Sequence, residues 1–205
     1  MARKISDRIY TLPVGMLEVN CYLATGKSGT LYIIDPGGDA DEIAKAAKEF
    51  NAPETMILLT HGHVDHISGI RETMNLLGIS KVFIHKDDIP LYKSPDNNLT
   101  PFVPAAKDLP EPAPAPDTDD FTIIHTPGHS KGGCCFYFKD MNTLFAGDTI
   151  FMYSVGRTDL PGGDQNALIK SINEKIMTLP QDTIIYPGHG PSTTVADEKS
   201  GNPYI

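Results

Sequence analysis

The 205-residue sequence has no tryptophan, only three cysteines and no long apolar run. Three cysteines cannot pair completely, so the disulfide framework of a small secreted protein is not expected. Basic residues are also scarce: 17 lysines and arginines oppose 26 acidic residues, giving a formal net charge of −9. This charge repels polyanions, so we expect neither nucleic acid nor a membrane as partner. A small-molecule substrate fits the charge better.

The N-terminal segment Met1–Tyr10 carries charges throughout and leads into no apolar stretch, which predicts neither a secretory signal nor a membrane anchor. We therefore expect a cytoplasmic protein. Its length fits one domain, residues 1–205, with the composition of an ordinary globular protein. Cys134 and Cys135 are neighbours in an apolar run, where alternation sends them to opposite faces. We interpret them as core thiols, and Cys21 lacks a nearby base that would make it a nucleophile.

Short apolar runs that end in turn or polar residues predict a mixed α and β protein with a layered β core. Strands are expected at Ile9–Pro13, Asn20–Ala24, Leu31–Asp35, Met56–Leu59, Lys81–His85, Phe121–His125, Gly133–Phe138, Thr143–Ala146 and Thr183–Tyr186. Helices are expected at Ala40–Phe50, His66–Leu77 and Asn166–Thr178. Asp39 is a candidate cap for the first helix.

The segment Ser94–Asp120 differs from the rest because it contains seven prolines. Proline removes a backbone donor, so neither a regular helix nor a central strand is expected there. The segment is predicted to be a long, stiffened loop. Both a lid over a binding site and a surface connection without function fit that prediction.

The segment Thr60–His66, Thr-His-Gly-His-Val-Asp-His, places four metal-capable side chains within six residues, between an apolar run and an amphipathic helix. Histidines near a helix start can simply cap the helix or lie exposed. However, loops after strands are where α/β layers usually hold ligands, and Gly62 lets the backbone turn so that His61 and His63 converge. The segment therefore predicts a metal site.

The same arrangement recurs, because His129, Asp148 and His189 each follow an apolar strand and a glycine. Four strand ends would then supply a mixed nitrogen and oxygen set suited to zinc, iron or manganese. The predicted ligands are His61, His63, Asp65, His66, His129, Asp148 and His189. Seven ligands are too many for one tetrahedral ion.

We expect two divalent ions, with Zn²⁺ favoured and Fe or Mn as alternatives. One ion would take His61, His63 and His129, and the other Asp65, His66 and His189, while Asp148 bridges them. Metal binding lowers the pKa of water to about 7, so a metal-bridging hydroxide is the expected nucleophile. Asp65 and Asp148 are the predicted catalytic carboxylates, Asp65 also orienting the hydroxide.

The motif Thr-His-x-His-x-Asp-His at residues 60–66, followed by His129, Asp148 and His189, resembles the metallo-β-lactamase superfamily. The resemblance extends from Asp35-Pro-Gly-Gly to His189-Gly-Pro. It implies an α+β fold, a four-layer αββα sandwich of two mixed sheets with helices on the outer faces and metals at one edge. Aspartate at position 148, where many true lactamases have cysteine, is similar to the binuclear hydrolase branch.

The segment His125–Ser130, with Gly147-Asp148 and Gly156-Arg157, resembles glyoxalase II, which hydrolyses S-D-lactoylglutathione. The resemblance implies a thioester hydrolase in which Arg157 contacts the substrate, although an ordinary surface ion pair fits Arg157 equally well. Tyr153 is a candidate pocket residue. The chain ends sixteen residues after His189, without the helical C-terminal domain of glyoxalase II, and is similar to small single-domain relatives.

Other functions remain open. An iron-dependent persulfide dioxygenase is a relative that uses only the first metal site, and a lactonase or β-lactamase would use the same hydroxide on another carbonyl. A protein that merely stores or senses metal is a non-enzymatic alternative. Among the remaining polar residues, Asp35 and His125 could support the metal ligands, whereas His85 fits a structural or surface role.

Overall fold

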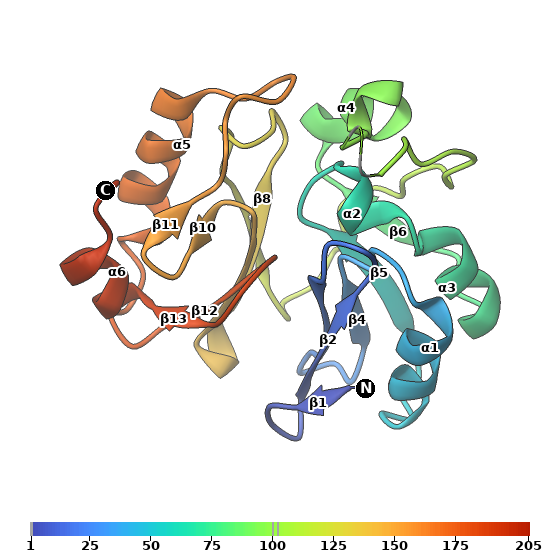
Figure 1. The fold of residues 1–205 in the computed structure, drawn as a ribbon. Coiled ribbons are helices and arrows are strands. Elements are labelled where there is room, and N and C mark those ends of the chain that lie inside the picture. The colour runs from blue at the N-terminus through green and yellow to red at the C-terminus, as the bar shows by residue number, and fades with distance from the viewer. Residues whose placement is uncertain (1, 100, 102) are drawn as a thin grey trace.

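The computed structural model describes residues 2–99, 101 and 103–205 (Figure 1). The first sheet has six strands in sequential order: β1 (Arg3–Lys4), β2 (Ile9–Val14), β3 (Val19–Thr25), β4 (Leu31–Ile34), β5 (Thr55–Leu59) and β6 (Val82–Ile84). The second sheet has the order β13 (Thr193–Thr194), β12 (Ile184–Pro187), β9 (Thr143–Gly147), β8 (Cys134–Phe138) and β7 (Thr122–His125). A separate hairpin joins β10 (Ile150–Phe151) to β11 (Ser154–Val155).

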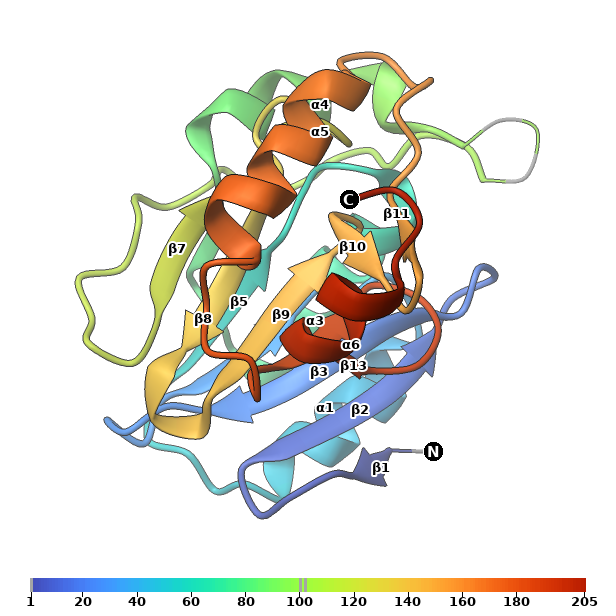
Figure 2. The ribbon, with the colours of Figure 1, turned by 90° about the vertical axis from the view of Figure 1, so that its left-hand side faces the viewer.

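Both sheets are mixed. The pairs β4–β5, β5–β6 and β9–β12 are parallel, and the other paired strands are antiparallel. Helices α1 (Ala40–Lys48) and α3 (Ile70–Leu77) lie on the outer side of the first sheet, and α5 (Gln165–Ser171) on that of the second (Figure 1). Figure 2 shows α5 and α6 (Val195–Gly201) in front of β8 and β9. The predicted αββα sandwich is confirmed.

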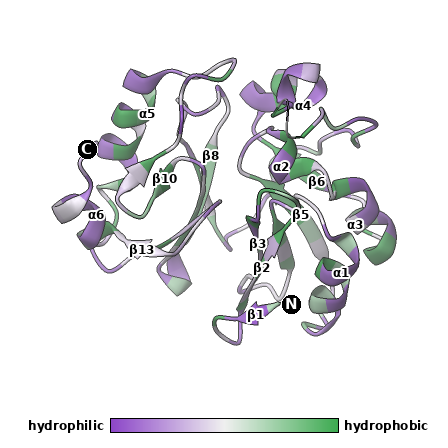
Figure 3. Cartoon of the chain, viewed as in Figure 1, coloured by the Kyte–Doolittle hydropathy of each residue, from purple (hydrophilic) through white to green (hydrophobic). Residues whose placement is uncertain are grey.

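Three apolar clusters separate the four layers, and strand alternation creates them. On β3, Leu23 packs with helix α1, while Tyr22 packs with aromatic side chains of the opposite sheet. On β8, Cys134 faces the space between the sheets and Cys135 faces α5, as the alternation predicts. In α1, for example, Ile43 and Ala47 are buried whereas Glu42 and Lys45 are exposed, and Figure 3 shows hydrophobic and hydrophilic residues alternating along the helices. All three cysteines are buried free thiols, as expected.

All nine predicted strands are present, with ends that differ by at most one residue. The sequence did not predict the short strands β1, β10, β11 and β13, the helices α4 (Ile89–Lys93) and α6, or the 3₁₀ turns Lys86–Asp88, Pro95–Asn97 and Lys139–Met141. The expected helix Asn166–Thr178 is α5 followed by a π-helical turn, Ile172–Ile176. These missed elements are short, and so carry little periodic signal.

The single helix predicted for His66–Leu77 is wrong, because the chain forms α2 (Val64–Ile67) and α3 with a break between them. The break lies at Gly69, whose N–H donates to the carbonyl of Pro36 at 2.9 Å. A Cβ there would lie 2.7 Å from that carbonyl oxygen. Tertiary contact with the loop after β4 therefore interrupts the helical periodicity.

The predicted cap of α1 is also wrong. Asp39 has a left-handed backbone conformation and its side chain makes no capping hydrogen bond. Its carboxylate instead accepts a hydrogen bond from the N–H of Gly15 at 2.8 Å. The carboxylate thus joins the start of α1 to the β2–β3 turn.

The proline-rich segment 94–120 forms no regular helix or strand in its described part, as predicted; Thr100 and Phe102 lie outside the described residues. Ala113 donates a backbone hydrogen bond to Val82 at 2.7 Å, and Tyr92 donates from its hydroxyl to the carbonyl of Pro110. The segment therefore runs along β6, the edge strand of the first sheet. No helix of the described chain has the length and apolarity needed to cross a bilayer.

Candidate metal centre

The seven predicted ligands come together at one edge of the sandwich, where strands of both sheets end. His61 and His63 follow β5, and Asp65 and His66 lie on α2, between the ends of the two sheets (Figure 1). The other three predicted ligands follow β7, β9 and β12. The convergence of strand ends expected from the sequence is therefore present.

His61, His63 and His129 form the first group of potential ligands, and all three are buried. His129 Nε2 lies 2.9 Å from His63 Nδ1 and 3.2 Å from His61 Nε2. Ligands of a tetrahedral ion with bonds of about 2.0–2.1 Å lie roughly 3.4 Å apart. The three nitrogens are therefore spaced closely enough to share one cation.

Asp65, His66 and His189 form a second group, in which Asp65 Oδ2 lies 3.2 Å from His189 Nε2 and 3.7 Å from His66 Nε2. Asp148 lies between the two groups. Its Oδ1 is 3.3 Å from His66 Nε2, and its Oδ2 is 3.7 Å from His129 Nε2 and 3.9 Å from His189 Nε2. The two triads that the sequence predicted are thus each close enough to share a cation, and His61, His66 and Asp148 form a further such group across them.

Two imidazoles of the first group, those of His61 and His63, have the neutral form that metal binding requires. Burial, together with the neighbouring His66, holds the pKa of His61 well below its usual range. Burial and the proximity of His129 lower the pKa of His63 to about 3. Both imidazoles are therefore neutral at pH 7, and neutral imidazole is the form that binds metals.

The second group has a different charge state. Burial opposes a charge on His66, but Asp65, Asp148 and Asp35 outweigh it and raise the pKa of His66 well above its usual range. Burial likewise opposes ionisation of Asp65 and Asp148, yet His66 and the other imidazoles hold both carboxyl pKa values below normal. Without a metal, a proton on His66 balances part of the negative charge.

Several polar atoms in this cluster are buried and lack a hydrogen-bond partner. They are His63 Nε2, Asp65 Oδ1, His66 Nε2 and Asp148 Oδ1. In the described chain, the other such buried side-chain atoms are threonine hydroxyls. A buried carboxylate or imidazole atom without a partner is costly, and a cation would compensate that cost. The donor set therefore fits divalent metal ions of the kind predicted.

Two neighbouring groups orient the imidazoles. His66 Nδ1 lies 2.9 Å from Asp35 Oδ2, and the same carboxylate accepts hydrogen bonds from the N–H and hydroxyl of Thr60. His129 Nδ1 lies 2.7 Å from the carbonyl of Arg157, to which it donates. These contacts direct the Nε2 atoms into the cluster. The supporting contact expected for Asp35 is therefore present.

The two predicted substrate residues lie outside the cluster. The guanidinium of Arg157 is exposed and makes a bidentate pair with Asp159, the surface ion pair considered above. Tyr153 is half-exposed, and a Cβ added to Gly201 would lie 2.7 Å from its ring. The ring of Tyr153 thus lies beside α6. Phe151, which the sequence did not single out, comes within 6.4 Å of the ring of His189.

His125 does not contact the seven predicted ligands through an observed hydrogen bond, but stacks on His85 with ring centroids 4.1 Å apart. Asp87 lies near both rings, so these three residues also group potential ligands. However, His125 Nε2 already donates to the carbonyl of Lys131, and His85 Nδ1 accepts from the N–H of Asp87. We assign no metal to this group.

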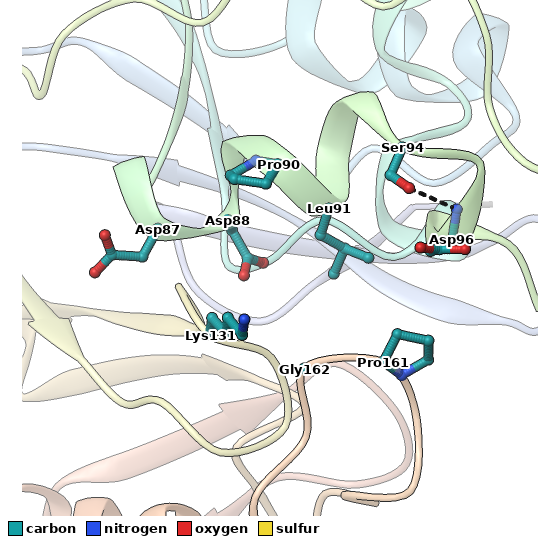
Figure 4. Close-up of a pocket in the computed structure, with 9 residues that line it drawn as sticks. All are labelled: Asp87, Asp88, Pro90, Leu91, Ser94, Asp96, Lys131, Pro161 and Gly162. Atoms are coloured by element: carbon teal, nitrogen blue, oxygen red, sulfur yellow. Dashed lines mark hydrogen bonds between the residues drawn. The ribbon is translucent and has the colours of Figure 1, made fainter.

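A pocket of about 220 Å³ lies beside the ligand loops (Figure 4). On one side it is lined by the start of α4, and on the other by Lys131 and the turn at Pro161 and Gly162. Asp88, which forms part of this wall, is fully buried. The sequence did not single it out because a Lys-Asp-Asp run resembles a solvated surface turn.

The fold and the cluster are those of the metallo-β-lactamase superfamily, and the chain belongs to it: the family model matches residues 14–189. Among solved structures, the chain is similar to the B3 metallo-β-lactamase BLEG-1, with a TM-score of 0.83 and 34% identity over 96% of this chain and 98% of that one. It is equally similar to TTHA1623 in a di-iron-bound form, with a TM-score of 0.83 and 33% identity over 95% and 99% of the two chains.

Among curated relatives, the chain is 34% identical over 206 residues to the hydroxyacylglutathione hydrolase GloC of Haemophilus influenzae, covering 96% of this chain and 97% of the relative. The superfamily consists mostly of metal-dependent hydrolases, and the His and Asp groups described above fit that class. The relatives differ in their named activities and metals, so family membership alone does not assign a substrate.

Proposed function

We propose that the protein is a binuclear metal-dependent hydrolase that cleaves a thioester such as S-D-lactoylglutathione. The observation that carries this proposal is the convergence of seven ligand side chains, four of which have a buried nitrogen or oxygen without a hydrogen-bond partner. The 34% identity to a hydroxyacylglutathione hydrolase supports the choice of a thioester. A thiolate is a good leaving group, so the reaction needs no strong general acid from the protein.

Two divalent ions, Zn²⁺ in this proposal with Fe or Mn as alternatives, would supply Lewis acidity and a nucleophile derived from water at neutral pH. His61, His63 and His129 would hold one ion, and Asp65, His66 and His189 the other. Asp148, within 4 Å of imidazole nitrogens from both groups, would be shared. His129 and His66 are held in the required tautomer by Arg157 O and Asp35.

In this proposal the carboxylates of Asp65 and Asp148 also take part in the reaction. Their lowered pKa values keep Asp65 and Asp148 ionised at neutral pH, although burial opposes it. Asp65 Oδ1 has no hydrogen-bond partner in the protein, so it is available to orient the attacking water or accept its proton. In this proposal Asp65 is therefore both a ligand and a catalytic residue.

The test begins with protein purified without added metal, followed by elemental analysis for zinc, iron and manganese. Steady-state kcat/KM is then compared for S-D-lactoylglutathione, other thioesters, lactones and nitrocefin. We expect about two metal ions per chain and the highest kcat/KM for a thioester. Nitrocefin is included because a lactamase is among the similar structures.

The remaining outcomes separate the alternatives. Oxygen consumption on glutathione persulfide by an iron-loaded protein, with no acyl hydrolysis, would replace the hydrolase by a dioxygenase. Bound metal without turnover of any of these substrates would indicate a metal-storing or metal-sensing protein. Preference for a lactone or nitrocefin would retain the metal centre but overturn the thioester assignment.

A further inference from the structure

Asp88 is a fully buried carboxylate that accepts three hydrogen bonds. Its Oδ2 accepts from the N–H of Gly62 at 2.8 Å and from the hydroxyl of Ser130 at 2.9 Å. Its Oδ1 accepts from the N–H of Gly132 at 2.6 Å. Both oxygens are therefore committed to donors from two distant parts of the chain, residues 62 and 130–132.

The donors to Asp88 lie next to predicted metal ligands. Gly62 lies between His61 and His63, in the turn after β5 of the first sheet, and Ser130 directly follows His129, in the turn before β8 of the second sheet. One carboxylate therefore joins the two turns that carry the first group of histidines. The two turns belong to different sheets, and besides Asp88 a backbone hydrogen bond from Cys134 N–H to Thr60 O, at 2.9 Å, also joins the sheets near them.

Close backbone contacts hold Asp88 in this place. A Cβ on Gly132 would lie 2.2 Å from the nitrogen and 2.7 Å from the Cβ of Asp88. A Cβ on Gly62 would lie 3.0 Å from the nitrogen of Tyr92, in α4. The segment that carries Asp88 is thus seated against both turns, and Figure 4 shows its side chain pointing from the start of α4 toward the loop with Lys131.

A second buried carboxylate, Asp35, reaches both groups, because the Thr60 hydroxyl that it holds lies 3.0 Å from His61 Nδ1. It contacts His66 Nδ1 and accepts two hydrogen bonds from Thr60. Among the hydrogen bonds of the described residues, Asp88 makes none with Asp65, His66 or His189. Asp88 therefore bonds only to the turns of the first group, whereas Asp35 is connected to His66 and, through Thr60, to His61.

We propose that Asp88 is a positioning residue for the histidine trio His61, His63 and His129, so that its carboxylate sets the affinity of one of the two metal sites selectively. This inference rests on the proposed binuclear function. Asparagine at position 88 would keep the shape of the side chain, but its amide N–H₂ would face an N–H or O–H donor. Two donors cannot form a hydrogen bond, so at least one of the three contacts would be lost. The turns would then shift apart, and loss of a supporting contact of this kind costs roughly 10–100-fold in metal affinity.

The test uses the full chain loaded with Co²⁺, whose paramagnetism shifts the proton NMR signals of its ligands. His129 Nδ1–H, bonded to Arg157 O, reports on the first site, and His66 Nδ1–H, bonded to Asp35, reports on the second. Both exchangeable signals are followed while a chelator removes Co²⁺. We compare the wild type with Asp88→Asn, Asp35→Asn and Asp120→Asn; the last removes a buried carboxylate with three donors remote from the cluster.

In Asp88→Asn we expect the His129 signal to disappear at a roughly 10–100-fold lower chelator concentration, while the His66 signal persists as in the wild type. Asp35→Asn should not show this selectivity, because Asp35 contacts His66 directly and His61 through Thr60, and Asp120→Asn should leave both signals unchanged. Parallel loss of both signals in Asp88→Asn, or no change in either, would overturn the inference.

Ser130→Ala is the fallback if Asp88→Asn fails to fold by circular dichroism, because it removes one of the three donors and leaves the carboxylate in place. It should weaken Co²⁺ binding at the His129 site by a smaller factor, and an unchanged His129 signal would overturn the inference. The wild type separates this outcome from the proposed function. If it binds two Co²⁺ but hydrolyses nothing, the proposed function fails while the positioning test still applies.

Discussion

At the residue scale, the pKa values of His61, His63 and His66 shift in different directions because their neighbours differ. Burial and the neighbouring imidazoles lower the pKa values of His61 and His63, and for His63 they outweigh the opposing charges of Asp148 and Asp65. His66 is equally buried but faces three carboxylates, which raise its pKa. Neutral imidazoles and ionised carboxylates thus occur side by side, as a cation site requires.

Asp148 is the residue whose loss should affect both ions, because it approaches imidazoles of both groups. We expect Asp148→Ala to lose bound metal and acyl turnover together. A decrease in kcat/KM of roughly 1,000-fold or more, about 4 kcal/mol of transition-state stabilisation, would accompany the loss. Elemental analysis and steady-state kinetics on the same preparation provide the check, and wild-type turnover in the variant would contradict the shared role.

The main chain and the side chain of Arg157 make different contacts, so their roles can be tested separately. The backbone carbonyl of Arg157 orients His129, and a substitution of the side chain leaves that carbonyl in place. The exposed guanidinium pairs with Asp159. We expect Arg157→Ala to raise KM for glutathione thioesters by roughly tenfold, about 1.4 kcal/mol, with little change in kcat. The matched variant Asp159→Ala frees the guanidinium and should not raise KM. Equal KM values in wild type and Arg157→Ala would leave Arg157 as a surface ion pair.

At the element scale, short segments that local periodicity does not specify hold the ligand loops. The break between α2 and α3 lets Gly69 approach the loop after β4, which carries Asp35 at its start. The segment with α4 approaches the turns of both sheets. The positions of the ligands therefore depend on how these elements pack, and less on the strands themselves.

Gly69→Ala tests that packing. The added methyl group would lie 2.7 Å from Pro36 O and 2.9 Å from Gly38 N, so the loop or α3 must move. We expect the free energy of unfolding to fall by about 1–3 kcal/mol, the usual cost of overpacking. Chemical denaturation measures it, with Glu72→Ala, an exposed change on α3, as the control that should stay within about 0.5 kcal/mol. A variant as stable as wild type would mean that this contact is easily relaxed.

At the scale of the whole molecule, an aromatic layer between the two sheets keeps their ligand-bearing ends together. Tyr22 and Phe145, from opposite sheets, have ring centroids 5.1 Å apart. The chain crosses from the first sheet to the second through the proline-rich segment. The end of this segment is fixed by hydrogen bonds that Asp120 accepts from Ser28 and Tyr32. Interactions at that crossing therefore stabilise the whole sandwich.

Asp120 predicts a pH dependence of stability. Burial opposes its ionisation, but hydrogen bonds from Ser28 and Tyr32 lower its pKa below the usual 3.8. A carboxyl with a lowered folded-state pKa stabilises the fold above the unfolded value, and this stabilisation is lost as the pH falls through the folded-state value. Asp120→Asn should thus reduce the free energy of unfolding at pH 7 by roughly 1–3 kcal/mol.

The difference between wild type and Asp120→Asn should shrink below about pH 3.8, where the carboxyl becomes protonated in the unfolded chain first. Urea denaturation at several pH values measures it. The exposed neighbour Asp119 provides the control, because Asp119→Asn should have little effect at any of these pH values. A difference that stays constant from pH 7 to pH 3 would show that the charge of Asp120 contributes nothing.

The local sequence determined the nine principal strands, the two-sided alternation of Cys134 and Cys135, and the identity of all seven residues that converge in the cluster. These features follow from patterns within a few residues: strand periodicity, turns after strands, and the ligand chemistry of histidine and aspartate. They are readable because neighbours in the chain specify them.

Only the tertiary structure decided the break at Gly69, the place of Asp39 and the burial of Asp88. Each depends on a partner brought close by the packing of the two sheets or their loops. Asp88 is the clearest case, since a Lys-Asp-Asp turn looks solvent-exposed until Gly62 and Ser130 arrive from opposite sheets. Contacts between distant segments have no periodic signal, so the sequence alone does not reveal them.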